Sequence, residues 1–446
     1  MSSRARITTL VAVAAAVIVA AVAALVFLNR PEEAPRPDPV AATVPVSLQA
    51  DGAPEDLSLG VVLTFGQSGE PGSEYNRAAQ GAVVAAQRFS QGGAPVTLET
   101  RNDRGTEDGA REAVRDLASQ GVSGIIVAGT GPQARAAAKT AEELGLPAIL
   151  PYASATEPGP ATWSTRASAA STEQALLTAL AGKERILFVG DEGQVPPSVQ
   201  FAQTLNLAEF EDVTALAQEA AVRTGNQPLP AAPDAPADAA VMMVADPADA
   251  VVVSAATPQR LARLVQALQA RDVSAPMILP DGAATPDFTA ALAKLDGTVS
   301  GQLVTLAPAG GDAVALQQDA QGRGMSAFLS AVRLAAGNPE VRNLAGDGPF
   351  SAEAWAADAA SHDAVVALVR AAALAGSGDP AEVGEALRTL ALGPGEGLAG
   401  PALDFTRPDA LTAAAVPVYA SAQDLGLRPA DAAAPRLVWI AATDAP

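Results

Sequence analysis

The sequence predicts an α/β protein built from two doubly wound lobes, each with a parallel sheet. The first observation is an alternation of buried strand segments with segments of helical periodicity, which begins at Leu57. The second is a break in this alternation near Glu157–Arg166, after which it starts again. The third is the length of 446 residues, which is too great for one simple core. Since repeated β-α-β units favour a parallel sheet with helices on both faces, we expect one such sheet on each side of the break.

The first stretch contains four expected strands, in the segments LSLGVVLTF, PVTLET, GVSGIIVAG and LPAILP. Apolar residues recur between them at i, i+3, i+4 and i+7, as in the set Ala110, Ala113, Val114 and Leu117. A further helix is expected to open at Pro132 and to stop at Gly145, because proline suits the first turn and glycine the position past the end.

The second stretch repeats this alternation. Its expected strands are RILFVGDEG, ADAVVVSA and APMILPDG, and the chain ends with the strand-like runs AAVPVYA and RLVWIAA. A proline-rich interruption at Gln227–Ala240 is interpreted as a surface loop or insertion.

Composition narrows the possible functions. The net charge is -21, and an acidic surface repels phosphate backbones, so we expect no nucleic-acid partner. The sequence has no cysteine, which excludes disulfides, thiolate metal sites and cysteine nucleophiles. Its one histidine, His362, excludes a histidine-rich metal site and is the only residue that a Ser-His-Asp triad could use. We expect no metal and no cofactor.

The N-terminus is predicted to be a membrane segment. Arg4 and Arg6 precede an uncharged run of 22 residues from Ile7 to Leu28. A spanning helix needs about 20 apolar residues, whereas the core of a signal peptide has about 7–15. We therefore expect residues 1–30 to form an uncleaved anchor in the cell membrane, with a cleaved signal peptide as the alternative. Both interpretations place the bulk of the chain outside the cytoplasm. Residues 31–56 are rich in proline and are expected to form a linker.

Several segments together resemble a known family. They are QGAVVAAQRFSQGGAPVTLETRND, GVSGIIVAGTGPQARAAAKTAEELGLPAILPYAS, ADAVVVSA, LVQALQARDVSAPMILPDG and SHDAVVALVRAAALAGSGDP. In order and spacing they resemble the type I periplasmic binding proteins, specifically the branched-chain amino-acid (Leu/Ile/Val) binding proteins of ABC transporters. The resemblance spans roughly Leu57 to Tyr419.

This resemblance implies a three-crossing hinge between the lobes, with the ligand held between them. It assigns residues 57–165 and 304–403 to lobe 1, and residues 166–303 and 404–446 to lobe 2. Closure of the lobes around the ligand would be a hinge motion, favoured by contacts made only in the closed state.

Two loops are candidates for holding a carboxylate. Thr130 and Gly131 precede a helix, whose terminal N–H groups attract anions, and the threonine hydroxyl is an additional donor. The resemblance implies that this loop holds the carboxylate of an amino acid, although an ordinary turn with a threonine cap is the alternative. It implies the same role for the loop after the next strand, where the candidates are Tyr152, Ala153 and Ser154. A polar turn is the alternative there.

Asp281, in the segment LPDG, is the candidate for holding an ammonium group, because a carboxylate accepts several charge-assisted hydrogen bonds. An Asp-Gly turn is the alternative. Tyr75, in the loop after the first strand, could line the pocket or serve in packing alone. Trp163 and His362 are interpreted as structural residues.

These observations predict an extracytoplasmic solute-binding protein that captures a small ligand, an amino acid, and presents it to the membrane permease of an ABC transporter. A regulatory or protein-interaction module on the same fold is the alternative. The sequence contains neither a GxSxG nucleophile elbow nor a GxxxxGK[ST] phosphate loop, so we expect no catalytic residues and no enzyme activity.

Overall fold

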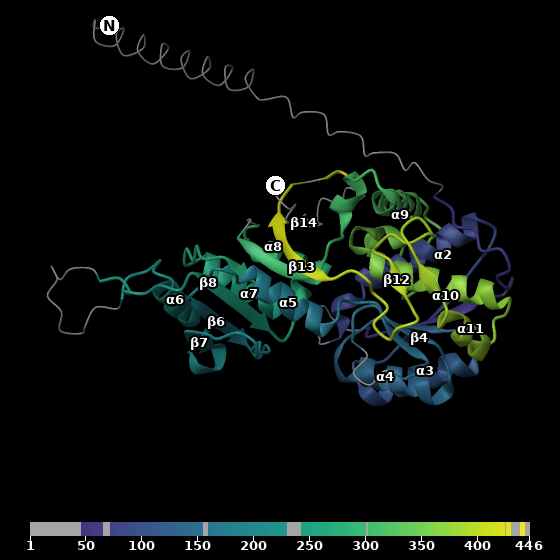
Figure 1. Cartoon of the computed structure of the whole chain (residues 1–446), viewed down its shortest axis with the longest axis horizontal. Coiled ribbons are helices and arrows are strands. Elements are labelled where there is room, and N and C mark those ends of the chain that lie inside the picture. The colour runs from purple at the N-terminus through teal and green to yellow at the C-terminus, as the bar shows by residue number, and fades with distance from the viewer. Residues whose placement is uncertain are drawn as a thin grey trace, which may run out of the picture. The chain divides into compact units, whose positions relative to one another are not determined.

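Two sheets of mainly parallel strands, each with helices on both faces, form the described part of the protein (Figure 1). The computed structural model describes residues 46–65, 72–154, 159–229, 242–299, 302–423, 425–429 and 438–441. The predicted anchor, residues 1–30, and the predicted linker up to residue 45 lie outside these ranges. The predicted α/β class with parallel sheets is confirmed.

The first sheet has five parallel strands in the order β2-β1-β3-β4-β5. They are β1 (Ser58–Leu63), β2 (Thr97–Asn102), β3 (Ile125–Val127), β4 (Ala148–Leu150) and β5 (Thr162–Ser164). The helices that connect them are α2 (Gly81–Gln91), α3 (Glu107–Ser119) and α4 (Gly131–Leu144). As the sequence predicts, α4 ends at Gly145, whose left-handed φ of 66° suits glycine.

Side chains of the first sheet alternate between two cores, because successive residues of a strand point to opposite faces. In β1, Leu59 and Val61 join the core that contains α2, whereas Val62 joins the core under α3 and α4. The first core also contains α9 (Ala320–Ala336), α10 (Ala359–Ala375) and α11 (Pro380–Leu387). The sheet is therefore buried on both faces, as the near-continuous apolar sequence of β1 predicts.

The second sheet repeats the strand order of the first. Its parallel strands are β6 (Ile186–Asp191), β7 (Gln203–Asn206), β8 (Ala250–Ala255), β9 (Met277–Ile278) and β10 (Leu303–Pro308), in the order β7-β6-β8-β9-β10. Two antiparallel strands, β13 (Ala415–Ser421) and β14 (Val438–Ala441), extend it beside β10. Its helices are α5 (Ala169–Ala179), α6 (Val213–Arg223), α7 (Pro258–Gln269) and α8 (Pro286–Lys294).

Short elements complete the fold. A small hairpin pairs β11 (Ala391–Leu392) with β12 (Leu403–Asp404). The 3-10 helices are η1 (Ser73–Tyr75), η2 (Ala78–Gln80), η3 (Leu207–Glu209), η4 (Asp281–Ala284), η5 (Asp312–Leu316), η6 (Phe350–Ala352) and η7 (Ala354–Ala356). Most of the proline-rich interruption expected at 227–240 lies outside the described residues, which end at 229 and resume at 242.

The strand β10 lies in a different sheet from the one that the expected boundary at 303/304 implies. β10 pairs in parallel with β9 and antiparallel with β13, so it belongs to the second sheet. The next helix, α9, contributes to the core of the first sheet. Sheet membership therefore puts the change of lobe after β10, because both neighbours of β10 are strands of the second sheet. Similarly, β12 ends at residue 404 and the chain re-enters the second sheet only at β13.

The end of β5 is joined to the segment that leads from β12 into the second sheet. The indole Nε1 of Trp163 donates a hydrogen bond of 2.8 Å to the carbonyl oxygen of Phe405, and the two rings meet edge to face. The backbone N–H of Ser164 donates to the carbonyl of Pro408, and its own carbonyl accepts from the N–H of Ala410. Trp163 is buried by these contacts, which give it a structural role.

Among the described residues, no single helix is long and apolar enough to cross a membrane. Only α10 and α11 reach the required length and composition together, and they are bent by 106° at the break between them.

Gly81, the first residue of α2, allows a close approach between this helix and the segment before α10. A Cβ atom at this position would lie 1.9 Å from the carbonyl oxygen of Asp358 and 2.5 Å from Oγ of Ser361. Its φ of -55° is ordinary for any residue, so close packing alone requires glycine here.

We predict that Gly81→Ala lowers the free energy of unfolding by about 1 to 3 kcal/mol, because α2 or the segment at Asp358 must shift. Gly384→Ala in α11 is the matched control, since its Cβ would meet only Pro147 at an ordinary 3.5 Å. Chemical denaturation of both variants measures the difference. Equal stabilities of the two variants would contradict the packing argument.

Candidate functional site

The predicted site residues follow the carboxyl ends of neighbouring strands. Tyr75 lies in the loop after β1, Thr130 and Gly131 follow β3, and Tyr152 follows β4. The chain adds β2 on one side of β1 and then β3, β4 and β5 on the other, so the strand order reverses between β1 and β3. Ligands of open α/β sheets bind at such a point. Asp281 follows β9, which holds the same place in the second sheet as β4 in the first.

Tyr75 brings these loops together. Its ring stacks on that of Tyr152, with centroids 4.1 Å apart and planes inclined by 15°. Burial raises the pKa of the Tyr75 phenol well above its usual range, and the negative charge of Asp281 raises it further, while Arg166 opposes them. Glu74 adds a smaller increase. Groups from both sheets therefore act on one phenol.

Asp281 pairs with a residue that sequence reasoning did not select. Its carboxylate forms an ion pair with the guanidinium of Arg166, whose Nη1 also donates to the carbonyl oxygen of Tyr152 at 3.3 Å. The side chains are partly open to solvent, with 28% of Arg166 and 42% of Asp281 exposed. Arg166 is the last residue of the break between the two predicted βα stretches. A charged residue at a connection between the sheets could therefore have been selected as a site residue from the sequence.

Thr130 also has an unforeseen partner. It precedes α4, but its side chain does not cap the helix. Instead its hydroxyl donates a hydrogen bond of 2.8 Å to Oε1 of Glu74, although Thr130 occupies the N-cap position of α4. Gly131 begins α4 with a φ of 75°, a conformation that favours glycine. Glu74 is charged and directly precedes the candidate Tyr75, and this was the feature of the sequence that could have identified it as a site residue.

The loop after β4 serves partly as support. The carbonyl oxygen of Ala153 accepts a hydrogen bond of 2.9 Å from Oγ of Ser164, which ties the loop to the end of β5. Ser154 is half-buried and directly precedes residues 155–158, which lie outside the described ranges. The structure thus brings Tyr75, Thr130, Tyr152 and Asp281 together more clearly than it does Ser154.

The carboxylate of Asp358 is buried near the hydroxyl of Tyr152. Asp358 caps α10, where it accepts hydrogen bonds from the backbone N–H and the hydroxyl of Ser361. Burial raises the pKa of Asp358 to about 6, although the bonds from Ser361 and the positive charge of Arg428 oppose the shift. Asp358 and Ser361 lie close enough to the Tyr152 hydroxyl to affect its pKa, which burial raises well above its usual range.

Among the described residues, five buried side-chain polar atoms have no hydrogen-bond partner, and three of them lie at this edge of the sheet. They are Oδ1 of Asn76 after β1, the hydroxyl of Tyr152 after β4 and Oγ1 of Thr165 after β5, none of which meets hydrogen-bond geometry with a described residue. The Tyr152 hydroxyl is near Asp358, but their geometry falls outside that of a hydrogen bond. Because buried polar atoms are nearly always paired, this edge of the sheet offers hydrogen-bonding capacity to water or a ligand.

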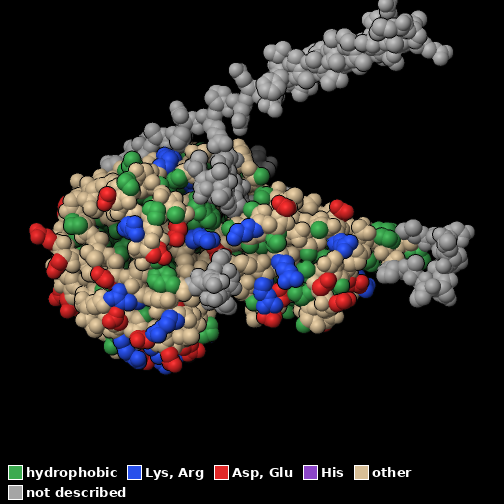
Figure 2. Space-filling view, turned by 180° about the vertical axis from the view of Figure 1, so that it is seen from behind, with side chains coloured by type: hydrophobic (Ala, Val, Ile, Leu, Met, Phe, Trp, Pro, Cys, Tyr) green, Lys and Arg blue, Asp and Glu red, His purple; other side chains and the backbone are tan. Residues whose placement is uncertain are grey.

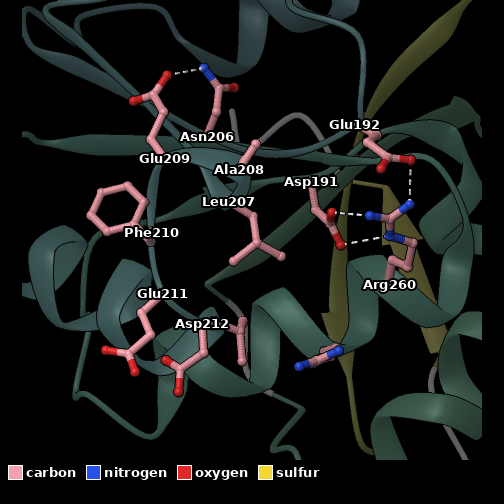
Figure 3. A pocket seen from close by; sticks show the side chains of 12 residues that line it. Asp191, Glu192, Asn206, Leu207, Ala208, Glu209, Phe210, Glu211, Asp212 and Arg260 are labelled. Atoms are coloured by element: carbon pink, nitrogen blue, oxygen red, sulfur yellow. Dashed lines mark hydrogen bonds and ion pairs between the residues drawn. The ribbon is translucent and has the colours of Figure 1, made fainter.

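A separate cavity of about 640 Å³ lies at the carboxyl ends of β6 and β7 (Figure 3). Five acidic side chains and two arginines contribute to its lining: Asp191, Glu192, Glu209, Glu211, Asp212, Arg260 and Arg263. The Arg260 guanidinium bridges Asp191 and Glu192, as Figure 3 shows. Sequence reasoning placed Asp191 at the end of a strand but predicted no site here. The guanidinium of Arg260 is thus paired with carboxylates of the cavity itself.

His362 is structural, as interpreted from the sequence. It is fully buried, with Nε2 at 2.9 Å from the Arg88 guanidinium and Nδ1 at 2.7 Å from Oδ1 of Asp363. Since the guanidinium only donates, Nε2 accepts and the ring is neutral with its proton on Nδ1. Both ring nitrogens are therefore occupied, which excludes a triad. Within the described ranges, no group of three or more potential ligands could hold a metal ion.

Comparison with solved structures shows that the fold is that of the type I periplasmic binding proteins. An extracellular ligand-binding receptor from Rhodopseudomonas palustris is 13% identical, covering 86% of this chain and 99% of its own, with a TM-score of 0.58. A leucine-binding protein from Thermotoga maritima is 16% identical, with coverages of 86% and 98% and a TM-score of 0.57.

An ABC transporter substrate-binding protein from Desulfitobacterium hafniense, solved in complex with leucine, is 14% identical, covering 86% of this chain and 100% of its own, with a TM-score of 0.57. The predicted resemblance is thereby confirmed for the fold, and these structures are binding proteins rather than enzymes. No protein-family model matches the sequence, and no curated protein matches it.

The raised pKa of Asp358 predicts a pH dependence of stability. Since its folded-state value of about 6 exceeds the ordinary 3.8, the stabilisation that it provides is complete below about pH 4 and is lost as the pH rises through 6. Asp358→Asn retains a capping side chain but does not ionise. Relative to this variant, the wild-type protein should lose about 2 to 3 kcal/mol of unfolding free energy between pH 4 and 7.

Denaturation across this pH range measures the difference in unfolding free energy between wild type and Asp358→Asn. The contributions of other titrating groups cancel because both proteins contain them. Asp379→Asn, at the exposed cap of α11, is the control and should leave the wild-type profile unchanged. Parallel profiles for wild type and Asp358→Asn would disprove the assignment.

Proposed function

We propose that the protein is an extracytoplasmic solute-binding protein that captures an amino acid for uptake by the permease of an ABC transporter. The observation that carries this proposal is the convergence on Tyr75 of loops from both sheets. They present a hydroxyl donor and a helix N-terminus at Thr130–Gly131, a carboxylate at Asp281, and buried polar atoms that have no partner among the described residues. A donor group and a carboxylate at the same ends of the sheets are the two groups that a zwitterion requires.

Each residue has a role in this proposal. Asp281 accepts hydrogen bonds from the ammonium group of the ligand. Thr130, Gly131 and the loop containing Tyr152, Ala153 and Ser154 supply donors to its carboxylate. Tyr75, stacked on Tyr152, offers an aromatic surface. Leucine is the first ligand to consider, since one similar structure is a leucine-binding protein and another contains leucine.

The proposal extends to location and partners. Residues 1–30 form the membrane anchor or signal segment and keep the folded part outside the cytoplasm. The permease is the protein partner. Acidic and basic side chains are interspersed on the face seen in Figure 2, and with a net charge of -21 we expect no nucleic-acid partner. The protein acts without catalysis, cofactor or metal.

A second candidate function is a regulatory or protein-interaction module of the cell envelope. It is favoured by the ion pair between Asp281 and Arg166 and by the bond between Thr130 and Glu74, because both candidate ligand groups have partners within the chain. Such a module would bind a protein and no small molecule.

We predict that leucine or a related amino acid raises the unfolding temperature of the full-length protein in mild detergent. Ligand at 100 times its dissociation constant adds about 2.7 kcal/mol to the free energy of unfolding. Asp281→Asn should abolish the shift. Asp296→Asn, which removes an exposed charge just after α8, is the matched control and should retain it.

A shift that survives Asp281→Asn would support solute binding but reject Asp281 as the ammonium site. The absence of a shift with every amino acid tested, in wild type and variants alike, would favour the interaction module.

A further inference from the structure

The carboxylate of Glu74 lies at the loop of Thr130 and Gly131, where the proposed function places the carboxylate of the ligand. One of its oxygens, Oε1, accepts from the hydroxyl of Thr130 at 2.8 Å, and the other accepts from the backbone N–H of Gly72. Thr130 immediately precedes α4, whose N-terminal end favours negative charge. The chain thus supplies the anion at this place itself.

The backbone at Gly72 holds Glu74 in this position. Its φ is 96°, and a Cβ atom there would lie 2.3 Å from Nε2 of Gln133 and 2.7 Å from Oγ1 of Thr64. Gly72 is therefore packed against both β1's end and α4, and its N–H points to the Glu74 carboxylate. Glu74 itself is only half-buried, so its side chain can leave for solvent.

Arg166 occupies the complementary position. Its guanidinium pairs with Asp281 and also donates to the carbonyl of Tyr152, so it presents a cation between the loops after β9 and β4. With 28% of the side chain exposed, Arg166 can also turn toward solvent. Glu74, Arg166 and Asp281 all act electrostatically on Tyr75, which places the two internal charges at one site.

We propose that Glu74 and Arg166 are internal substitutes for the two charged ends of the ligand, which binds by displacing both. This inference rests on the proposed function and defines the chemistry of its ligand as one carboxylate and one cationic amine. A zwitterion replaces both internal charges at once, whereas a ligand with one charged end replaces only one. Glu74 and Arg166 therefore set selectivity for zwitterions and keep the unliganded site neutralised.

Three test ligands separate the two positions: leucine, leucinamide, which lacks the carboxylate, and 4-methylpentanoate, which lacks the amine. Glu74→Ala removes competition for Thr130, so it should tighten binding of leucine and 4-methylpentanoate about tenfold and leave leucinamide unchanged. Arg166→Gln frees Asp281, so it should tighten binding of leucine and leucinamide by a similar factor and leave 4-methylpentanoate unchanged. Calorimetric titration of the full-length protein in mild detergent measures all nine pairs.

Glu209→Ala and Arg263→Gln, in the cavity beside β6 and β7, are matched controls that remove the same charges elsewhere and should change no affinity. Glu74→Gln replaces Glu74→Ala if the latter does not fold, as judged from its unfolding temperature without ligand. It removes the charge but retains the size of the side chain.

The inference is supported if Glu74→Ala binds the ligands that carry a carboxylate more tightly than wild type does, and leucinamide no more tightly. This includes the case in which wild type binds too weakly to measure. If wild type binds leucine and the Glu74→Ala and Arg166→Gln variants bind it equally or more weakly, the inference is overturned but the proposed function is retained. Absence of binding in wild type and every variant overturns both, because removing the internal charges would then have opened no site.

Discussion

Parallel strands carry their carboxyl ends to one edge of a sheet, and every group of the candidate site depends on this constraint. Tyr75, Thr130 and Tyr152 are far apart in sequence but follow β1, β3 and β4, which are neighbours in the first sheet. The second sheet repeats the same order, so the segment after β9 presents Asp281 from the equivalent place. Helices on both faces bury the sheets and leave these edges as the positions where polar side chains can gather.

Two kinds of buried charge in the first lobe have different consequences. Arg88 and Asp363 are linked through His362, and Asp363 also accepts from the backbone N–H groups of Ala399 and Gly400. Each charge in that network has partners, so it fixes α10 against α2. Asp358, at the start of the same helix, has fewer donors and a raised pKa. The network stabilises the core, whereas Asp358 makes the part of the core nearest Tyr152 sensitive to pH.

Much of the fold could be predicted from the sequence because hydrophobic periodicity reports burial directly. The expected strands at RILFVGDEG and ADAVVVSA became β6 and β8, and the helix ending at Gly145 was correctly bounded. Periodicity does not state which sheet a strand joins. The boundary at 303/304 came from the resemblance instead, and it put β10 with the first lobe, whereas β10 pairs in the second sheet. Glu74 and Arg166 were missed for a related reason. Their roles depend on distances to Thr130 and Asp281 that only the folded chain defines.

The contacts between Trp163 and Phe405, and between Ser164 and its two backbone partners, join the end of β5 to the segment between β12 and β13. Arg166 lies two residues beyond Ser164, so these bonds fix the start of the chain segment that carries its guanidinium. The segment before β13 therefore takes part in positioning the cation that pairs with Asp281, although it contributes no side chain to that ion pair.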